Sequence, residues 1–207
     1  SLARGFTVAD AFALVADLHA AYPDVPIFIM AYASLVATPG AAAFADAARE
    51  AGATGLIVPD LPFDADEGLA EACAAAGLAS VPVAAPSMRS ERLKAMASLG
   101  RPYLYAALRA GITGSATEVG EDTKSFLAAA GSGGSKVLGG FGIRTGTQAR
   151  AVAPYAHAVV AGSVFVTAIA EVIAAQSAGR SADYSGSPRV RDEAIRRAVR
   201  EKAEEIT

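Results

Sequence analysis

The sequence has little of the residue types that most often build cross-links and metal centres. Its 207 residues include one cysteine, two histidines and no tryptophan. A single cysteine, Cys73, excludes a disulfide framework and a cysteine metal cluster within this sequence. The histidines, His19 and His157, lie far apart in the sequence, and we expect neither to act as a catalytic base. We therefore predict no metal site and a reducing, cytoplasmic setting.

An excess of positive charge and long apolar runs are also lacking. Lys and Arg number 18 against 21 Asp and Glu, which gives a net charge of −3. A nucleic-acid-binding protein needs a basic excess to hold phosphate backbones, so we expect no such partner. Apolar runs such as VPIFIMAYASLVA are too short and too interrupted to span a bilayer. The opening residues SLARGFTVADAF lack the basic and apolar regions of a signal peptide.

The sequence is 53% hydrophobic, and its apolar residues form short runs that alternate with segments of helical spacing. Short runs that are apolar throughout are typical of strands buried on both faces. The predicted strands are Pro26–Ala31, Gly55–Val58, Ala79–Val83, Tyr103–Ala107, Lys136–Gly139 and His157–Ala161. The predicted helices are Val8–Ala21, Pro39–Ala51, Ala65–Ala75, Ser90–Ser98, Glu121–Ala130, Thr145–Ala153, Ser163–Ala175 and Val190–Ile206.

This alternation predicts an α/β fold with a parallel sheet and helices outside it. The sheet is either open and doubly wound or closed into a TIM (β/α)₈ barrel. No glycine-rich dinucleotide fingerprint follows the first strand, which favours the barrel. A barrel has eight strands and the sequence supplies six. We therefore expect residues 1–207 to form a single domain, an incomplete barrel equal to its C-terminal three quarters.

Three late loops, each following a predicted strand, are rich in glycine: LRAGITGSATEVG, GGFGIRTG and AGSVF. Loops at these positions of a barrel bind phosphate, because glycine lets backbone N–H groups approach the anion and a helix N-terminus attracts it. The alternative is that the glycines only relieve crowding at the rim. The segment AAAGSGGSKV resembles a flexible linker, but its position favours an ordinary helix-to-strand loop.

A few polar residues stand at the ends of predicted strands. Ser163 suits a helix N-cap and a phosphate ligand equally well. Asp60 either lines a site at the barrel mouth or bonds its own turn. Arg109 begins the loop after the fourth strand, where it suits an anion, a closing loop or a surface ion pair. Tyr32 and Tyr105 are typical of rim packing.

The ordered set MAYASLV, IVPDLP, AAPS, YLYAALRAGITG, LGGFGI and VVAGSVFV resembles the tryptophan synthase alpha chain family, and the resemblance runs from Ser1 to about Ile173. It implies a (β/α)₈ barrel that cleaves indole-3-glycerol phosphate to indole and glyceraldehyde 3-phosphate. It also implies no cofactor of its own and a partner beta chain that carries pyridoxal phosphate. Other phosphate-binding barrels lack support, since the metal-binding His and Asp of an epimerase and the strand-end Lys of an indole-glycerol-phosphate synthase are absent.

The resemblance also implies roles for residues that match its motifs. The phosphate-binding residues would be Gly114, Gly140, Gly142, Gly162 and Ser163. The walls of the substrate pocket would be Ile57, Tyr105 and Phe141, with Tyr32 and Asp60 at its mouth. Arg109, Thr113 and Gly114 would belong to a loop that closes over the substrate.

The family's catalytic Glu and Asp belong to a PFSDPxADGP-like segment that these 207 residues do not contain. We therefore assign no catalytic residue here and expect the first two strands of the barrel to lie outside this sequence. The expected function is that of a tryptophan synthase alpha subunit, a lyase of a heterotetramer, with inefficient cleavage by this stretch alone. The alternative is a non-catalytic relative that binds phosphate and docks on a partner subunit.

Overall fold

The computed structural model describes residues 5–108, 119–178 and 188–207. The described residues form two compact units. Unit 1 contains the described chain up to Ala84 together with Arg89–Tyr105 and Ala130–Lys136. Unit 2 contains the described parts of Ala85–Met88, Ala106–Ala129 and Val137–Thr207.

A parallel three-stranded sheet organises unit 1. Its strands are β1 (Phe28–Met30), β2 (Gly55–Ile57) and β3 (Ala79–Val81), in that order across the sheet. The register pairs Phe28 with Gly55, and Gly55 with Ala79. Every strand in this sheet runs the same way, so the carboxyl ends of the strands lie at one edge. The loops that carry Tyr32 and Asp60 leave the sheet at this edge.

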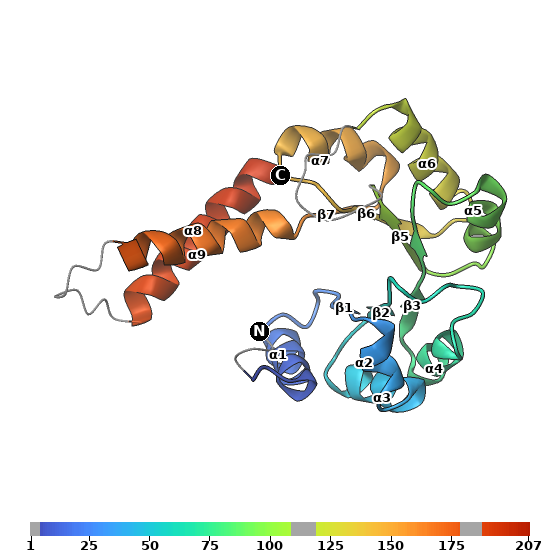
Figure 1. The fold of residues 1–207 in the computed structure, drawn as a ribbon, viewed down its shortest axis with the longest axis horizontal. Helices are drawn as coiled ribbons and strands as arrows, with labels where there is room; N and C mark the ends of the chain where they lie inside the picture. Colours follow the sequence, from blue (N-terminus) through green and yellow to red (C-terminus); the bar gives the residue numbers. More distant parts are fainter. Residues whose placement is uncertain (1–4, 109–118, 179–187) are drawn as a thin grey trace. The chain divides into compact units, whose positions relative to one another are not determined.

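Five helices belong to the described part of unit 1, and a buried apolar cluster joins several of them to the sheet. They are α1 (Val8–Ala21), α2 (Ala33–Ala37), α3 (Ala41–Glu50), α4 (Leu69–Ala76) and α5 (Ser90–Ala97). Leu56 of β2 packs in this cluster with Phe44 of α3 and Cys73 of α4. Figure 1 shows α2, α3 and α4 on one side of β1, β2 and β3. The apolar residues of these helices therefore cover one face of the sheet, as the sequence predicted.

Proline divides the third predicted strand into two. Pro82 has no N–H group for the strand ladder, so β3 ends at Val81 and β4 covers only Val83–Ala84. Pro82 still accepts a hydrogen bond from the N–H of Tyr105 at 2.9 Å. The second sheet has the order β4, β5 (Tyr103–Ala107), β6 (Lys136–Gly140) and β7 (Ala158–Val160).

The described helices of the later chain are α6 (Glu121–Gly131), α7 (Gly146–Val152), the short 3-10 helix η2 (Ala153–Tyr155), α8 (Ser163–Ala178) and α9 (Pro188–Ile206). Within unit 2, α9 packs against α8 and α7. Every third or fourth residue of α9 is at least partly buried, from Ala194 through Ile206, while its charged residues are mostly exposed. The prediction of an amphipathic helix with a solvated charged face is confirmed.

Several predicted helix bounds differ from the structure. The helix predicted over Ala65–Ala75 begins only at Leu69, after the left-handed Gly68 with φ of 81°, and the helix predicted over Ser163–Ala175 continues to Ala178. Pro39 was expected in the first turn of a helix over Pro39–Ala51, but it lies in a turn between α2 and α3. The left-handed Gly40, with φ of 91°, precedes α3 instead. The short helix α2 was not predicted; it follows the first predicted strand, Pro26–Ala31, and its five residues are too few to show helical spacing.

The glycine-rich loop between α6 and β6 is an ordinary packed connection, as predicted, and not a linker. Ser135 is buried, and its hydroxyl donates to the carbonyl of Arg101 at 2.8 Å. Gly133 lies so close to α5 that a side chain there would overlap the Ala97 carbonyl. The composition that resembles a linker therefore reflects close packing of backbone on backbone.

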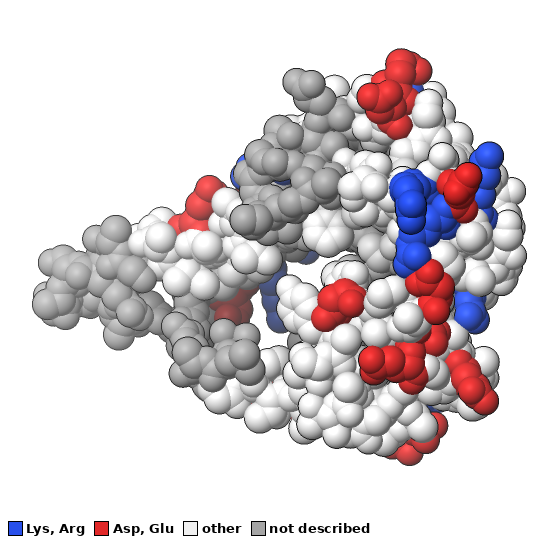
Figure 2. All heavy atoms as spheres, turned by 45° about the vertical axis from the view of Figure 1, so that its right-hand side comes forward, with Lys and Arg blue, Asp and Glu red and all other residues white. Residues whose placement is uncertain are grey.

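No helix in the described part of the chain has the length and apolar character needed to cross a membrane. On the face drawn in Figure 2, acidic and basic side chains occur beside one another over the described residues. This mixture fits the small net charge of −3.

Candidate functional site

The turn after β6 has an unusual backbone. Phe141 has φ of 76° and Gly142 has φ of 88°, so two consecutive residues are left-handed. A bulky non-glycine residue in this region carries strain, and such strain concentrates at functional sites. The ring of Phe141 is half-buried and Gly140 is buried. The sequence pattern GGFG predicted a close approach of backbone here, but it did not predict that Phe141 itself is left-handed.

The strained turn leads directly into a firmly capped helix. The Thr145 hydroxyl accepts from the N–H of Gln148 at 3.3 Å, and the Gln148 side chain accepts from the N–H of Thr145 at 3.2 Å. The same Gln148 oxygen accepts from the N–H of Arg144 at 2.8 Å. The T-x-x-Q signature of this capping box was present in the sequence but was not used to predict it. The cap fixes the backbone just after the glycines.

The loop after β7 is short and open. Helix α8 begins at Ser163, so Gly162 occupies the cap position, one residue before the predicted N-cap. The Gly162 carbonyl accepts from the N–H groups of Phe165 at 3.0 Å and Val166 at 3.3 Å. Gly162 and Ser163 are exposed, and a Cβ atom on Gly162 would meet nothing within 4 Å. The first N–H groups of a helix have no partner inside it, so this terminus suits an anion.

Two predicted wall residues lie on strands of unit 1. Ile57 ends β2 and is 5% exposed, and Tyr105 of β5 is 3% exposed. Burial raises the pKa of the Tyr105 hydroxyl to about 12. This side chain is therefore neutral in physiological conditions, which suits an apolar wall and not a general base.

The two predicted mouth residues of unit 1 lie on neighbouring loops. Asp60 follows β2, and its carboxylate accepts from the N–H of Ala33 at 2.9 Å. This bond satisfies a donor at the start of α2, where the preceding Tyr32 supplies no side-chain cap. Of the two alternatives for Asp60, bonding within its own turn is wrong, because its partner lies 27 residues away. Tyr32 is 66% exposed and fills no core position.

The candidate residues therefore fall into two groups. Gly140, Phe141, Gly142, Gly162 and Ser163 belong to unit 2, whereas Tyr32, Ile57, Asp60 and Tyr105 belong to unit 1. Arg109, Thr113 and Gly114 lie outside the described residues. Among the residues that the structure does describe, no group of three or more His, Cys, Asp or Glu side chains could hold a metal ion.

Two buried acidic groups predict how stability depends on pH. Burial raises the pKa of the Cys73 thiol to about 11, as it raises that of Tyr105 to about 12. In the unfolded chain these groups lose their protons at lower pH, near 9 and 10. Their contribution is complete below about pH 9 and is lost as pH rises through the folded pKa values. We expect the unfolding free energy to fall by up to about 1.4 kcal/mol per pH unit for each group.

Urea unfolding at a series of pH values between about 8 and 11 measures this loss. The matched variant Cys73→Ala has no thiol to titrate. Its free energy of unfolding should therefore begin to fall at a higher pH than that of the unmodified chain, and should fall less steeply. A decline of equal slope in both proteins would contradict the role of the buried thiol.

These observations define a class of protein: a parallel α/β fold whose late strand ends carry strained or open glycine turns. Two solved structures from Pyrococcus furiosus give that class its architecture, the TIM barrel. The tryptophan synthase α2β2 complex matches with a TM-score of 0.79 and 27% identity, covering 99% of this chain and 75% of that chain. A mutant tryptophan synthase alpha subunit matches with a TM-score of 0.77 and 26% identity, over 99% and 75% of the two chains.

Sequence comparison gives the family. The family model "Tryptophan synthase alpha chain" matches residues 1–191. The alpha chain of Laribacter hongkongensis is 39% identical over 87% of this chain and 68% of its own length. The alpha chain of Halobacterium salinarum is 40% identical over 78% of this chain and 59% of its own length. The chain belongs to the tryptophan synthase alpha chain family, whose members are lyases that cleave indole-3-glycerol phosphate in tryptophan biosynthesis.

Proposed function

We propose that this chain forms the substrate-binding part of a tryptophan synthase alpha subunit and holds indole-3-glycerol phosphate by its phosphate group. The observation that best supports this proposal is the left-handed backbone of Phe141 and Gly142 at the end of β6, in a chain of this family. Strain of this kind is retained where a function needs the backbone in that position. The exposed N-terminus of α8 supplies a second set of N–H donors for the anion.

Each group of residues receives a role in this proposal. Backbone N–H groups at Gly140, Gly142, Gly162 and Ser163 hold the phosphate together with Gly114. Phe141, Ile57 and Tyr105 form apolar walls, with Arg109 and Thr113 in the closing loop and Tyr32 at the mouth. Asp60 acts as a positioning residue, because its carboxylate holds the N–H of Ala33.

Cleavage also requires an acid and a base. The carbon–carbon bond breaks when a proton is added to the indole ring and another is removed from the substrate hydroxyl. We assign neither step to residues 1–207, because the PFSDPxADGP-like segment that carries the family's two acids is not among them. A general acid or base contributes about 10²–10⁴-fold to a rate, so these residues alone should cleave slowly.

The test is an indole-release assay with indole-3-glycerol phosphate. The chain is assayed alone and fused to an N-terminal segment that supplies the family's two acids. We expect a gain of at least about 10³-fold in the fused protein. A fused protein that folds and binds the substrate but releases no indole would contradict the catalytic proposal. That result would favour a non-catalytic phosphate-binding relative.

The proposal includes a partner. One solved neighbour is an α2β2 complex of tryptophan synthase. We propose that this chain docks on a beta chain that carries pyridoxal phosphate and receives the indole, in the cytoplasm. Neither the proposed phosphate grip nor the apolar walls require a cofactor bound to this chain.

A further inference from the structure

The loop 58–68 leads from the end of β2 to the start of α4 and follows directly on the proposed wall residue Ile57. It contains three aspartates, and each binds a group on a different helix of unit 1. Three separate attachments restrict where such a connection lies. The pairs, in chain order, are Asp60 with Ala33 of α2, Asp64 with Arg92 of α5, and Asp66 with Ala70 of α4.

The middle attachment is an ion pair of two side chains. Both terminal nitrogens of Arg92 donate to the Asp64 carboxylate, at 2.5 and 2.6 Å. A bidentate pair fixes the direction of approach as well as the distance. The same guanidinium lies 4.9 Å from the centre of the Phe63 ring. The hydrogen bonds from Arg92 also lower the pKa of the Asp64 carboxyl, so the pair stays charged at neutral pH.

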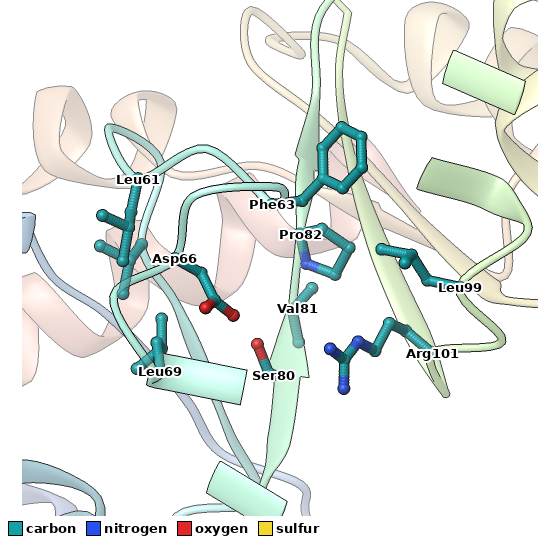
Figure 3. Close-up of a pocket in the computed structure, with 10 residues that line it drawn as sticks. Leu61, Phe63, Asp66, Leu69, Ser80, Val81, Pro82, Leu99 and Arg101 are labelled. Carbon is teal, nitrogen blue, oxygen red and sulfur yellow. The ribbon is translucent and has the colours of Figure 1, made fainter. Parts of the chain in front are cut away.

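Arg92 holds a part of the loop that has little other support. Leu61 packs against the core cluster of unit 1, whereas Figure 3 shows Phe63 pointing in the opposite direction. Among the described residues, the backbone of segment 62–65 makes one hydrogen bond, the local one from the Ala65 N–H to the Pro62 carbonyl at 3.1 Å. The contacts with Arg92 are therefore what connect the middle of the loop to a helix.

The position of the loop matters at the start of α2. Ala33 is the first residue of that helix, and the first N–H groups of a helix have no acceptor inside it. Asp60 supplies the acceptor at 2.9 Å, four residues before Asp64 in the same loop. The residue before Ala33 is Tyr32, at the mouth of the proposed substrate pocket, and it makes no side-chain cap. Displacement of the loop would release both Ala33 and this mouth.

We propose that Arg92 is a positioning residue for the mouth of the substrate pocket. Through Asp64 and Phe63 it holds the loop 58–68, and the loop holds Asp60 on the first N–H of α2. This inference rests on the proposed function. The side chains of Arg92 and Asp64 are 38% and 46% exposed, so the pair contributes little to the stability of the whole chain. Its loss should loosen the mouth and leave the rest of unit 1 folded.

Amide hydrogen exchange, followed by NMR, tests the first step without any ligand. In Arg92→Gln the N–H of Ala33 should exchange about threefold to fivefold faster, because local opening becomes easier by the worth of an exposed pair. The N–H of Ala48, inside α3, should exchange at an unchanged rate. Unchanged exchange at Ala33 in the folded variant overturns the proposal. Equal acceleration at Ala33 and Ala48 also overturns it, since the effect would then be global.

Two further proteins separate the pair from a general effect of charge. Lys94→Gln removes one positive charge from an exposed position on the same helix, where Lys94 pairs with no carboxylate among the described residues. Exchange at Ala33 should not change in this protein. Asp64→Arg combined with Arg92→Asp restores an opposite-charge pair and should slow the exchange again. A swapped protein that exchanges as fast as Arg92→Gln would contradict the role of the pair.

Calorimetric titration with indole-3-glycerol phosphate tests the second step. Arg92→Gln should bind the substrate about threefold to fivefold more weakly, Lys94→Gln should bind it normally, and the swapped protein should recover affinity. Faster exchange at Ala33 with unchanged affinity would contradict a role at the mouth. A failure of the unmodified chain to bind the substrate would contradict the proposed function itself. Exchange at Ala33 would then still show whether Arg92 holds the loop.

Discussion

Gly133→Ala is expected to lower the free energy of unfolding by about 3 kcal/mol, which corresponds to a fall in melting temperature of roughly 6–12 °C. The added Cβ would overlap the carbonyl group of Ala97 at the end of α5. The obstacle is backbone and not the end of a flexible side chain, so relief requires movement of the loop or the helix. Thermal and urea unfolding measure the loss.

A neighbouring glycine provides the control. Gly134 has φ of 84°, but a Cβ there would meet nothing within 4 Å. Asn tolerates this left-handed backbone better than most residues, so Gly134→Asn should cost less than about 1 kcal/mol. If the two variants were equally stable, the close approach of Gly133 to Ala97 would have no energetic role.

Gly162→Asp is expected to weaken binding of indole-3-glycerol phosphate by about hundredfold or more without unfolding the protein. The position is exposed and has open space around its Cβ, so the side chain fits. The new carboxylate would compete for the N-terminus of α8 and repel the phosphate. Calorimetric titration with the substrate measures the change.

The matched control is Gly120→Asp. Gly120 also precedes a helix, α6, and a Cβ there meets nothing within 4 Å. Both changes place a carboxylate before a helix N-terminus, so both should alter stability by a similar small amount. Only the change at Gly162 should weaken substrate binding. A Gly162→Asp protein that binds the substrate normally would remove the α8 terminus from the proposed phosphate grip.

Local pattern was sufficient for the elements with strong periodicity. The helix Val8–Ala21 and the strand Tyr103–Ala107 have the bounds that their sequence predicted. Burial on both faces stabilises Tyr103–Ala107. Val8–Ala21 has no buried residue, and its start is fixed by the local capping box of Thr7 and Asp10. The bounds near Pro39 and Pro82 were wrong or incomplete, because a proline marks an interruption without showing whether a helix begins or a strand divides.

For the candidate site, the sequence supplied residue types and positions but not partners. The hydrogen bond from Ala33 to Asp60 joins residues 27 apart, and no spacing rule indicates such a pair. Phe141 was predicted as a wall residue from the resemblance to the family. Its left-handed backbone depends on the contacts that fix the end of the strand in the folded chain. The sequence pattern does not specify these contacts.

The sequence by itself determined the family, the alternation of strands and helices, and the glycine turns at the late strand ends, because these depend on local composition and spacing. Only the tertiary structure decided which groups come close: Gly133 beside Ala97, Asp60 on Ala33, and Arg92 on Asp64. These contacts join segments distant in the chain. Their energies depend on the positions of single atoms, which are fixed only when the elements pack together.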